Sequence, residues 1–317
     1  MADLASEPEI VFKKKKSTWK QIKEQKVLLI MIFPIVVWLF IFSYVPLWGW
    51  TMAFQNFRPQ YSFFQQEWVG LTHFRNLLVN NSFFMQALRN TIGMGILGLI
   101  FNFLASISFA ILLNELRFLR FKRIVQTISY LPHFVSWVIV SNLVITMLAP
   151  DGAVNGLLMW LGIFDEPLHF MAQPSMFWGV VTGAEVWKST GWGAIIYLAA
   201  MAGIDPGLYE AAQMDGANRF QRIRHITLPG IRPTIMVLLI MSVGHLINIG
   251  FERQFLLGNT IVASHARVIE WYALHYGIGL FRLSYGTAVG MFRSAISIML
   301  LFLANGMARK MGEGRIM

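Results

Sequence analysis

The sequence predicts an all-α integral membrane protein with six transmembrane helices. Of its 317 residues, 56% are hydrophobic and only 13% are charged, whereas soluble domains carry about 25% charged residues. Six apolar stretches approach or exceed the roughly 20 residues that a helix needs to cross a bilayer. These stretches are residues 27–49, 88–113, 124–148, 176–201, 231–251 and 285–307. Lipid is therefore the expected solvent for most of the chain.

The distribution of basic residues predicts the orientation of these spans. Most of the 26 Lys and Arg residues lie before the first span, after the second and fourth spans, or in the tail. Cytoplasmic loops carry an excess of Lys and Arg, so these four regions are expected on the cytoplasmic side. Six spans then leave both termini in the cytoplasm. The net charge of +10 is interpreted as this topological signal and not as a nucleic-acid site.

The predicted organisation follows from the spans and their charges. A basic cytoplasmic segment, whose lysine run could also contact anionic lipid headgroups, precedes the first transmembrane helix. An extracytoplasmic loop leads to a core of five further helices and a short cytoplasmic tail. The boundaries are 1–26, 27–49, 50–87, 88–307 and 308–317.

The cytoplasmic loop after the fourth span, residues 203–229, is too polar to cross a membrane. Asp205 can cap a helix and is followed by a proline suited to its first position. The pair Asp215-Gly216 indicates a turn. An amphipathic helix follows and is expected to end at Pro229, where the next span begins. The pattern predicts a helical hairpin, which either packs under the bundle or docks a cytoplasmic partner.

Nine residues of this hairpin match the type and spacing of the EAA motif of permease subunits in binding-protein-dependent ABC importers. They are Glu210, Ala211, Ala212, Asp215, Gly216, Ala217, Ile226, Leu228 and Pro229. The resemblance implies the type I ABC importer permease fold, in which this loop forms coupling helices held in a cleft of the ATPase. It also implies that Glu210 contacts the ATPase and that Gly216 lets the two helices turn.

Further stretches resemble one branch of these permeases, which imports oligo- and polysaccharides such as aldouronates, rhamnogalacturonan fragments and alginate. They are Trp187-Lys188, Gly191-Trp192, Phe251-Glu252 and residues 284–290. Arg253-Gln254 departs from that pattern. The resemblance implies a bacterial inner-membrane complex with a second homologous permease, two ATP-binding subunits and an extracytoplasmic solute-binding protein.

The sequence lacks the motifs of a catalytic site. No Walker A loop is present, because Thr182 and Trp187 occupy the two glycine positions before Lys188-Ser189. There is no cysteine, and no metal-binding or nucleophile motif occurs. The chain is therefore expected to be no enzyme and to hold no cofactor or metal, with ATP and Mg bound by the partner ATPases.

Several polar and aromatic residues fall inside the predicted spans, where ionisable groups usually face a bundle interior or a wet path. We expect Glu185 to pair with Lys188 one turn away, and His245, Asn248 and Glu252 to share one face of a helix. The hypothesis is that such faces line a translocation path for sugars. The candidates are Glu185, Trp187, Lys188, Trp192, His245, Asn248, Glu252 and Arg293. The alternative is that these charges form structural pairs between helices.

Three rival functions stay open from the sequence. A secondary transporter or channel acting alone would need internal repeats, and none is evident. A membrane-embedded enzyme would need a clustered acid–base or metal site. A permease for another class of solute would share the coupling hairpin and differ in its path.

Overall fold

A computed structural model describes residues 24–79 and 81–310. The predictions for most of the basic N-terminal segment and for the last residues of the tail lie outside these ranges. The chain forms two compact units that divide after Thr51, and each is described by itself.

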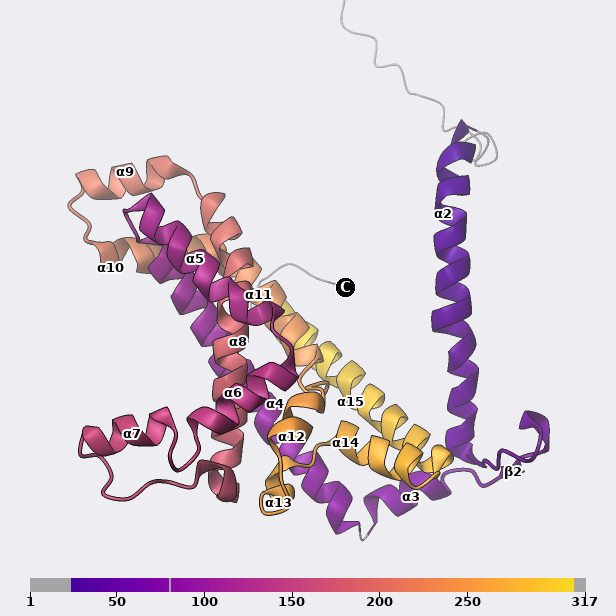
Figure 1. Cartoon of the computed structure of the whole chain (residues 1–317). Helices are drawn as coiled ribbons and strands as arrows, with labels where there is room; N and C mark the ends of the chain where they lie inside the picture. Colours follow the sequence, from indigo (N-terminus) through magenta and orange to yellow (C-terminus); the bar gives the residue numbers. More distant parts are fainter. Residues whose placement is uncertain (1–23, 80, 311–317) are drawn as a thin grey trace, which may run out of the picture. The chain divides into compact units, whose positions relative to one another are not determined.

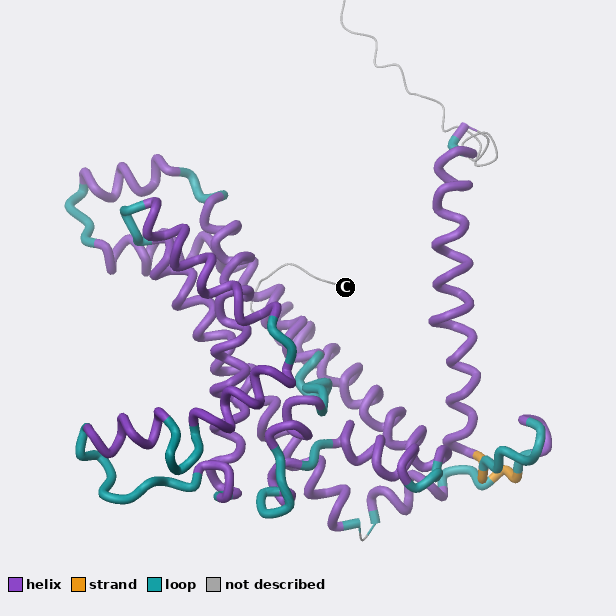
Figure 2. Tube along the Cα trace, in the orientation of Figure 1, coloured by secondary structure: helices purple, strands orange, loops and turns teal. Residues whose placement is uncertain are grey.

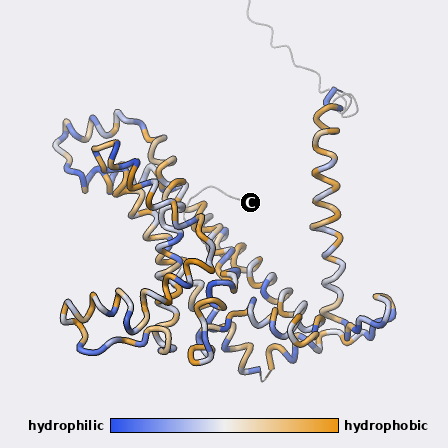
Figure 3. The backbone as a smooth tube through the Cα atoms, in the orientation of Figure 1, coloured by the Kyte–Doolittle hydropathy of each residue, from blue (hydrophilic) through white to orange (hydrophobic). Residues whose placement is uncertain are grey.

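Unit one is a single apolar helical rod. It comprises α2 (Lys26–Leu39), a π-helical turn η1 (Phe40–Tyr44) and most of the 3₁₀ helix η2 (Val45–Phe54). With the last residues of η2, which belong to unit two, they form a continuous stretch of 29 residues, Lys26–Phe54, that is long and apolar enough to span a membrane. The side chains of α2 are apolar on every face of the helix, and the helix is largely hydrophobic along its length (Figure 3). This is expected for a helix whose surroundings are lipid or another chain.

Unit two begins with short elements that lead into the helical bundle. A two-stranded antiparallel sheet pairs β1 (Gln55–Asn56) with β2 (Glu67–Trp68) and is the only sheet in the described residues (Figure 2). The 3₁₀ turn η3 (Phe63–Gln65) lies between the strands, and α3 (Thr72–Leu78) follows them.

The bundle is built around two long helices, α4 (Ser82–Asn114) and α8 (Pro174–Ala202), which pack against each other along their length. Helix α5 (Leu119–Phe134) packs on α8. A Cβ on Gly191 of α8 would lie 2.0 Å from the carbonyl oxygen of Ser129 in α5. Only glycine therefore permits this approach of α5 to α8.

The chain between α5 and α8 departs from one straight span. Helix α6 (Trp137–Met147) follows α5 after a break and is bent from it by 105°, so the predicted span 124–148 is two helices. A surface excursion then holds α7 (Ala153–Trp160) and η4 (Phe170–Ala172).

The second half of unit two completes the bundle. The hairpin is formed by α9 (Pro206–Met214) and α10 (Arg219–Arg222). After it, α11 (Leu228–Gly244) packs on α15 (Leu283–Lys310). Short helices lie between them: α12 (Glu252–Leu257), α13 (Ala263–Ala266), α14 (Ile269–Leu274) and the π-helical turn η6 (His275–Gly279). In Figure 1, α9, α10 and the start of α5 lie at one end of unit two, and α3, α7 and α13 at the other.

Four stretches of the described residues are long and apolar enough to span a membrane, and the bent pair α5–α6 makes up to five. Helix α8 has 29 residues, which is enough length, but it is less apolar because it carries Glu185 and Lys188. The count of six spans stays a prediction.

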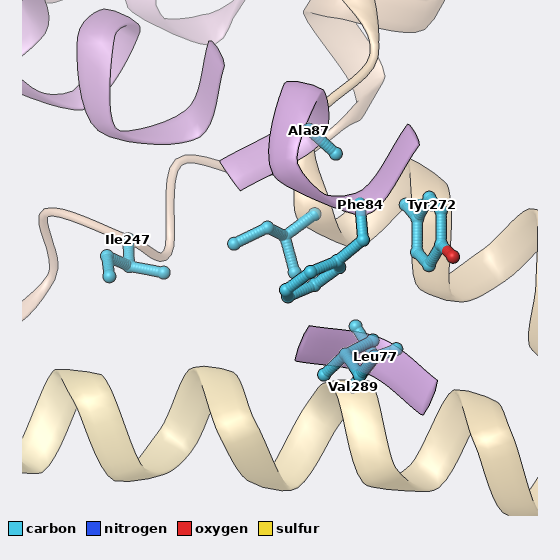
Figure 4. Packing of buried hydrophobic residues seen from close by; sticks show 7 residues of the cluster. Leu77, Phe84, Ala87, Ile247, Tyr272 and Val289 are labelled. Atoms are coloured by element: carbon cyan, nitrogen blue, oxygen red, sulfur yellow. The ribbon is translucent and has the colours of Figure 1, made fainter. Parts of the chain in front are cut away.

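A buried cluster joins α3 and the start of α4 to the later helices. Phe84 lies at its centre among Leu77, Ala87, Tyr272 and Val289 (Figure 4). Ile247 belongs to the same cluster and is 1% exposed, although it lies outside any helix. This packing fixes the end of unit two that lies away from the hairpin.

Candidate functional site

The hairpin begins as the sequence predicts. Helix α8 ends at Ala202, and the Asp205 side chain accepts a hydrogen bond of 2.9 Å from the backbone N–H of Gly207. Pro206 occupies the first turn of α9, where its missing N–H costs nothing. A Cβ on Gly230 of α11 would lie 2.7 Å from Ile204, so the short link before α9 packs directly on α11.

The turn between α9 and α10 depends on Gly216. Its φ is +77°, and a Cβ placed there would meet nothing within 4 Å, so glycine is required for its backbone conformation and not for space. The backbone N–H of Ala217 returns to the carbonyl of Ala212 at 2.9 Å. Asn218 and Gln221 then form a reciprocal capping box that starts α10.

The second arm of the hairpin does not end at Pro229, so that prediction was wrong. Helix α10 passes through a π-helical turn η5 (Ile223–Thr227) directly into α11, and Pro229 lies in the first turn of α11. Pro229 has no N–H to donate to the preceding turn. It lies two residues after the π-helical turn, and such local adjustments let a helix continue through a proline. Residues 219–244 are consequently one continuous helical stretch.

The two arms are also tied to each other. The hydroxyl of Tyr209 in α9 lies 2.9 Å from Oγ1 of Thr227, and Thr227 is 1% exposed. This bond joins α9 to the point where α10 enters α11. Movement of α9 is therefore expected to be transmitted to α11.

The hairpin presents a mixed surface to its surroundings (Figure 3). Leu208, Met214 and Phe220 are 53%, 88% and 69% exposed. Of the nine motif residues, five are exposed and four partly buried. The exposed ones are Glu210, Ala211, Asp215, Gly216 and Pro229; the others are Ala212, Ala217, Ile226 and Leu228. Exposed apolar side chains beside charged ones are typical of a surface that contacts another protein.

A cavity of about 380 Å³ lies in the bundle between α4, α8 and α11. Three of the predicted path residues line it, namely Glu185, His245 and Asn248, together with Ser242 and Arg253. Asn248 also donates a hydrogen bond of 3.2 Å to Ser297 of α15. Among the described residues, no three His, Asp or Glu side chains come together as a metal site.

His245, Asn248 and Glu252 do not share one face of a helix, so that prediction was wrong. Helix α11 ends at Gly244, and the chain continues irregularly to Gly250, which has a φ of +74°. His245 and Asn248 therefore reach the cavity from an irregular segment. Glu252 starts α12, is exposed and does not line the cavity.

The expected pair between Glu185 and Lys188 is absent from the described structure. Glu185 instead forms an ion pair of 2.5 Å with Arg253 of α12. Arg253 is 8% exposed, so it is a buried counter-ion that sequence reasoning missed. The available signal was a carboxylate in an apolar helix, which needs a cation nearby, but the sequence pointed to Lys188 as that cation.

Lys188 caps the break between α5 and α6. Its ammonium donates hydrogen bonds to the carbonyls of Pro132, His133 and Val135 at 3.1, 2.6 and 2.7 Å. Carbonyls at a helix end lack the N–H groups of a following turn. Among these three, that of Pro132 also accepts a hydrogen bond of 3.2 Å from the backbone N–H of Val135. The ammonium also lies 5.8 Å from the centre of the Trp137 ring, within the range of a cation–π interaction.

The other predicted path residues do not line this cavity. Trp192 stacks on His133 with ring centres 4.5 Å apart, while Trp187 lines a separate apolar cavity beside α6 and α7. Arg293 pairs with Glu270 and lines a third cavity. The structure thus groups Glu185, His245 and Asn248 and separates Trp187, Lys188, Trp192, Glu252 and Arg293 from them.

Replacing Lys188 with Met is expected to lower stability by about 3 kcal/mol, because three carbonyls lose a charged donor. Thermal unfolding of the purified protein in detergent measures this effect. Lys122→Met serves as the control, because the side chain of this α5 lysine makes no described hydrogen bond. Equal melting temperatures for the two variants would contradict the capping role.

Comparison with known proteins places this geometry in a family. The family model described as "Binding-protein-dependent transport system inner membrane component" matches residues 103–312, which is more than half of the chain and includes the hairpin. The chain belongs to this family. It is a membrane permease, the transport component of an ABC importer and not its catalytic ATPase.

The permease is similar to two Bacillus subtilis proteins. Protein LplB is 41% identical over 293 residues, covering 92% of this chain and 91% of that protein. The polygalacturonan/rhamnogalacturonan transport system permease protein YteP is 41% identical over 307 residues, covering 96% and 95%.

Two solved structures resemble the permease over nearly its whole length. A chain of a bacterial ABC transporter that imports the acidic polysaccharide alginate is 39% identical, with a TM-score of 0.83 over 92% of this chain and 98% of that one. A chain of the bacterial alginate transporter in complex with its alginate pentasaccharide-bound periplasmic protein is 38% identical, with a TM-score of 0.85 over 94% and 99%.

Proposed function

We propose that this permease forms half of the transmembrane path of an ATP-driven importer for oligo- or polysaccharides. The observation that carries the proposal is its likeness, over 94% of its length, to a chain of an alginate transporter bound to a saccharide-loaded periplasmic protein. Its similarity to the polygalacturonan/rhamnogalacturonan permease supports the same class of substrate.

The hairpin is proposed as the site that couples this permease to an ATPase subunit. Supporting this role, α10 continues into α11 as one helical stretch of 26 residues. The hydrogen bond between Tyr209 and Thr227 joins α9 to this helical stretch. ATP binding by the partner would pull on the exposed surface, and α11 would carry that motion to the cavity at its other end.

The hairpin end is proposed to face the cytoplasm. Basic residues gather at this end, such as Arg117 and Arg120 near the start of α5 and Arg219 in α10. The excursion containing α7 lies at the other end and carries Asp151 and Asp165. Cytoplasmic segments are rich in Lys and Arg, so this separation supports cytoplasmic termini and an extracytoplasmic α7.

The cavity is proposed as this subunit's share of the path. Glu185, His245 and Asn248 would meet the substrate there, with a second homologous permease supplying the other half. Lys188, Trp192 and Arg293 are assigned to the structure of the bundle, in line with the alternative that the sequence left open. Two ATP-binding subunits and an extracytoplasmic binding protein would complete the importer.

Co-expression with the companion permease and ATPase subunits tests this function. The ATPase is expected to co-purify with this permease. In proteoliposomes, saccharide uptake should require both ATP and the loaded binding protein. Uptake by this chain alone, without an ATPase, would favour a stand-alone transporter and contradict the proposal.

A further inference from the structure

A polar pocket of about 460 Å³ lies at the end of unit two that faces away from the hairpin. We call it the outer pocket and define it by His73 and Asn76 of α3, Tyr276 of η6, and Phe281 and Arg282 after it. Its volume lies within the roughly 300–1,000 Å³ of small-molecule sites. It shares no lining residue with the cavity between α4, α8 and α11.

The floor of the outer pocket is held by a closed set of hydrogen bonds. The amide of Asn81 donates to the hydroxyls of Tyr272 and Tyr285 at 2.9 and 2.7 Å, and these hydroxyls lie 2.9 Å apart. The backbone N–H of Phe57 donates to Oγ of Ser284 at 2.9 Å. The walls are therefore fixed before any ligand arrives, which lowers the entropic cost of binding.

The rim of the outer pocket, by contrast, offers polar groups that have no partner. Within the described residues, the side chains of Asn76, Tyr276 and Arg282 make no hydrogen bond or ion pair with another side chain or with the backbone. No carboxylate lines the pocket, and Leu283 is its only aliphatic residue. The lining thus favours a polar, negatively charged ligand over an acyl chain.

The backbone at the rim is strained. Phe281 has a φ of +54° and is the only described residue other than glycine with a positive φ. Its ring is 82% exposed, so burial of the ring does not explain the conformation. It lies two residues after the end of η6, and both π-helical turns and strained residues concentrate at functional sites. Both Phe281 and the next residue, Arg282, line the pocket.

We propose that the outer pocket binds a uronate unit of an acidic oligosaccharide on the extracytoplasmic side, an inference that rests on the proposed function. Arg282 would bind the carboxylate with two parallel hydrogen bonds. The Phe281 ring would stack on the sugar face, and Asn76 with Tyr276 would bind hydroxyls. The pocket would select acidic chains before they enter the bundle.

Binding of trigalacturonate to the assembled transporter in nanodiscs, without binding protein, tests this site. Its fully methyl-esterified form is the neutral comparison. Arg282→Gln should weaken trigalacturonate binding about tenfold, as expected for loss of a charge-assisted hydrogen bond, and leave the ester unaffected. Arg75→Gln is the matched control, because Arg75 is exposed on α3 and does not line the pocket.

A second pair of variants tests the ring. Phe281→Asn removes it while keeping a residue that tolerates positive φ, and it should weaken binding of both acid and ester about fivefold. Phe281→Tyr keeps the ring and should bind like the wild type.

Two outcomes would overturn the site: equal effects of Arg282→Gln and Arg75→Gln, or competition by phosphatidylglycerol, which would assign the pocket to a lipid headgroup. If the wild type still imports saccharides with ATP, the proposed function stands and only the subsite falls. A wild type without ATP-dependent uptake would remove the proposed function itself.

Discussion

Replacing Gly216 with Val is expected to abolish most saccharide uptake while the assembled complex still hydrolyses ATP. The backbone at Gly216 has a φ of +77°, and a residue with a Cβ pays about 1–2 kcal/mol to adopt it, more when β-branched. This corresponds to about a tenfold loss of the correct turn. Because a Cβ there would meet nothing within 4 Å in this chain, a clash inside the permease does not explain a defect.

Gly216→Asn is the matched control, since Asn adopts positive φ far more readily than Val. It should retain most of the uptake. Uptake and ATPase rates measured on the same proteoliposomes separate coupling from assembly. Normal transport by the Val variant would show that the turn does not carry the motion.

Glu210→Lys tests the contact surface of the same hairpin. Glu210 is exposed, and its side chain makes no hydrogen bond or ion pair within the described residues. Reversing the charge at this position should therefore leave the fold of the hairpin intact. It should uncouple transport only by weakening the contact with the ATPase subunit. A variant with lowered thermal stability would instead give Glu210 a structural role.

Removing either member of the Glu185–Arg253 pair is the second change with a large expected effect. Breaking a buried ion pair by deleting one partner costs about 3–5 kcal/mol, because the other charge stays desolvated. The lower end of this range applies here, since 23% of the Glu185 side chain remains exposed. The pair holds α12 against α8 at the wall of the cavity, so saccharide uptake should fall as well.

A double-mutant cycle isolates this interaction. We expect Glu185→Gln and Arg253→Met each to lower the melting temperature, and the double variant to lose much less than the sum. Thermal unfolding of the purified complex in detergent gives all four values. Additive losses would mean that the ion pair contributes nothing to stability.

Local signals in the sequence predicted the hairpin well. Asp205 caps α9, and Gly216 makes the turn that follows it. Both features depend only on residues that are close in the sequence, so a local sequence pattern predicts them. The prediction from Pro229 was wrong because proline usually ends a helix, whereas here the π-helical turn η5 precedes it and the helix continues. No pattern in the sequence predicts this π-helical turn.

The cavity could be predicted only in part because it depends on long-range packing. Leu246 and Ile247 read as a continuation of the fifth span, but Ile247 leaves the helix to join the buried cluster around Phe84. Glu185 forms an ion pair with Arg253, which is distant in the sequence. Lys188 donates hydrogen bonds to backbone carbonyls at the break between α5 and α6. Neither contact has a periodic signature.

Site-specific crosslinking at the hairpin tests the coupling claim most directly. The chain has no cysteine, so Met214→Cys adds one reactive group at a position that is 88% exposed. Trp160→Cys, at an 80% exposed position in α7 at the other end of unit two, is the control. Treating the assembled transporter with a short bifunctional thiol–amine crosslinker should join the Met214→Cys variant to the ATPase subunit and leave the Trp160→Cys variant unlinked to it. An ATPase adduct at position 160, or none at position 214, would contradict the account.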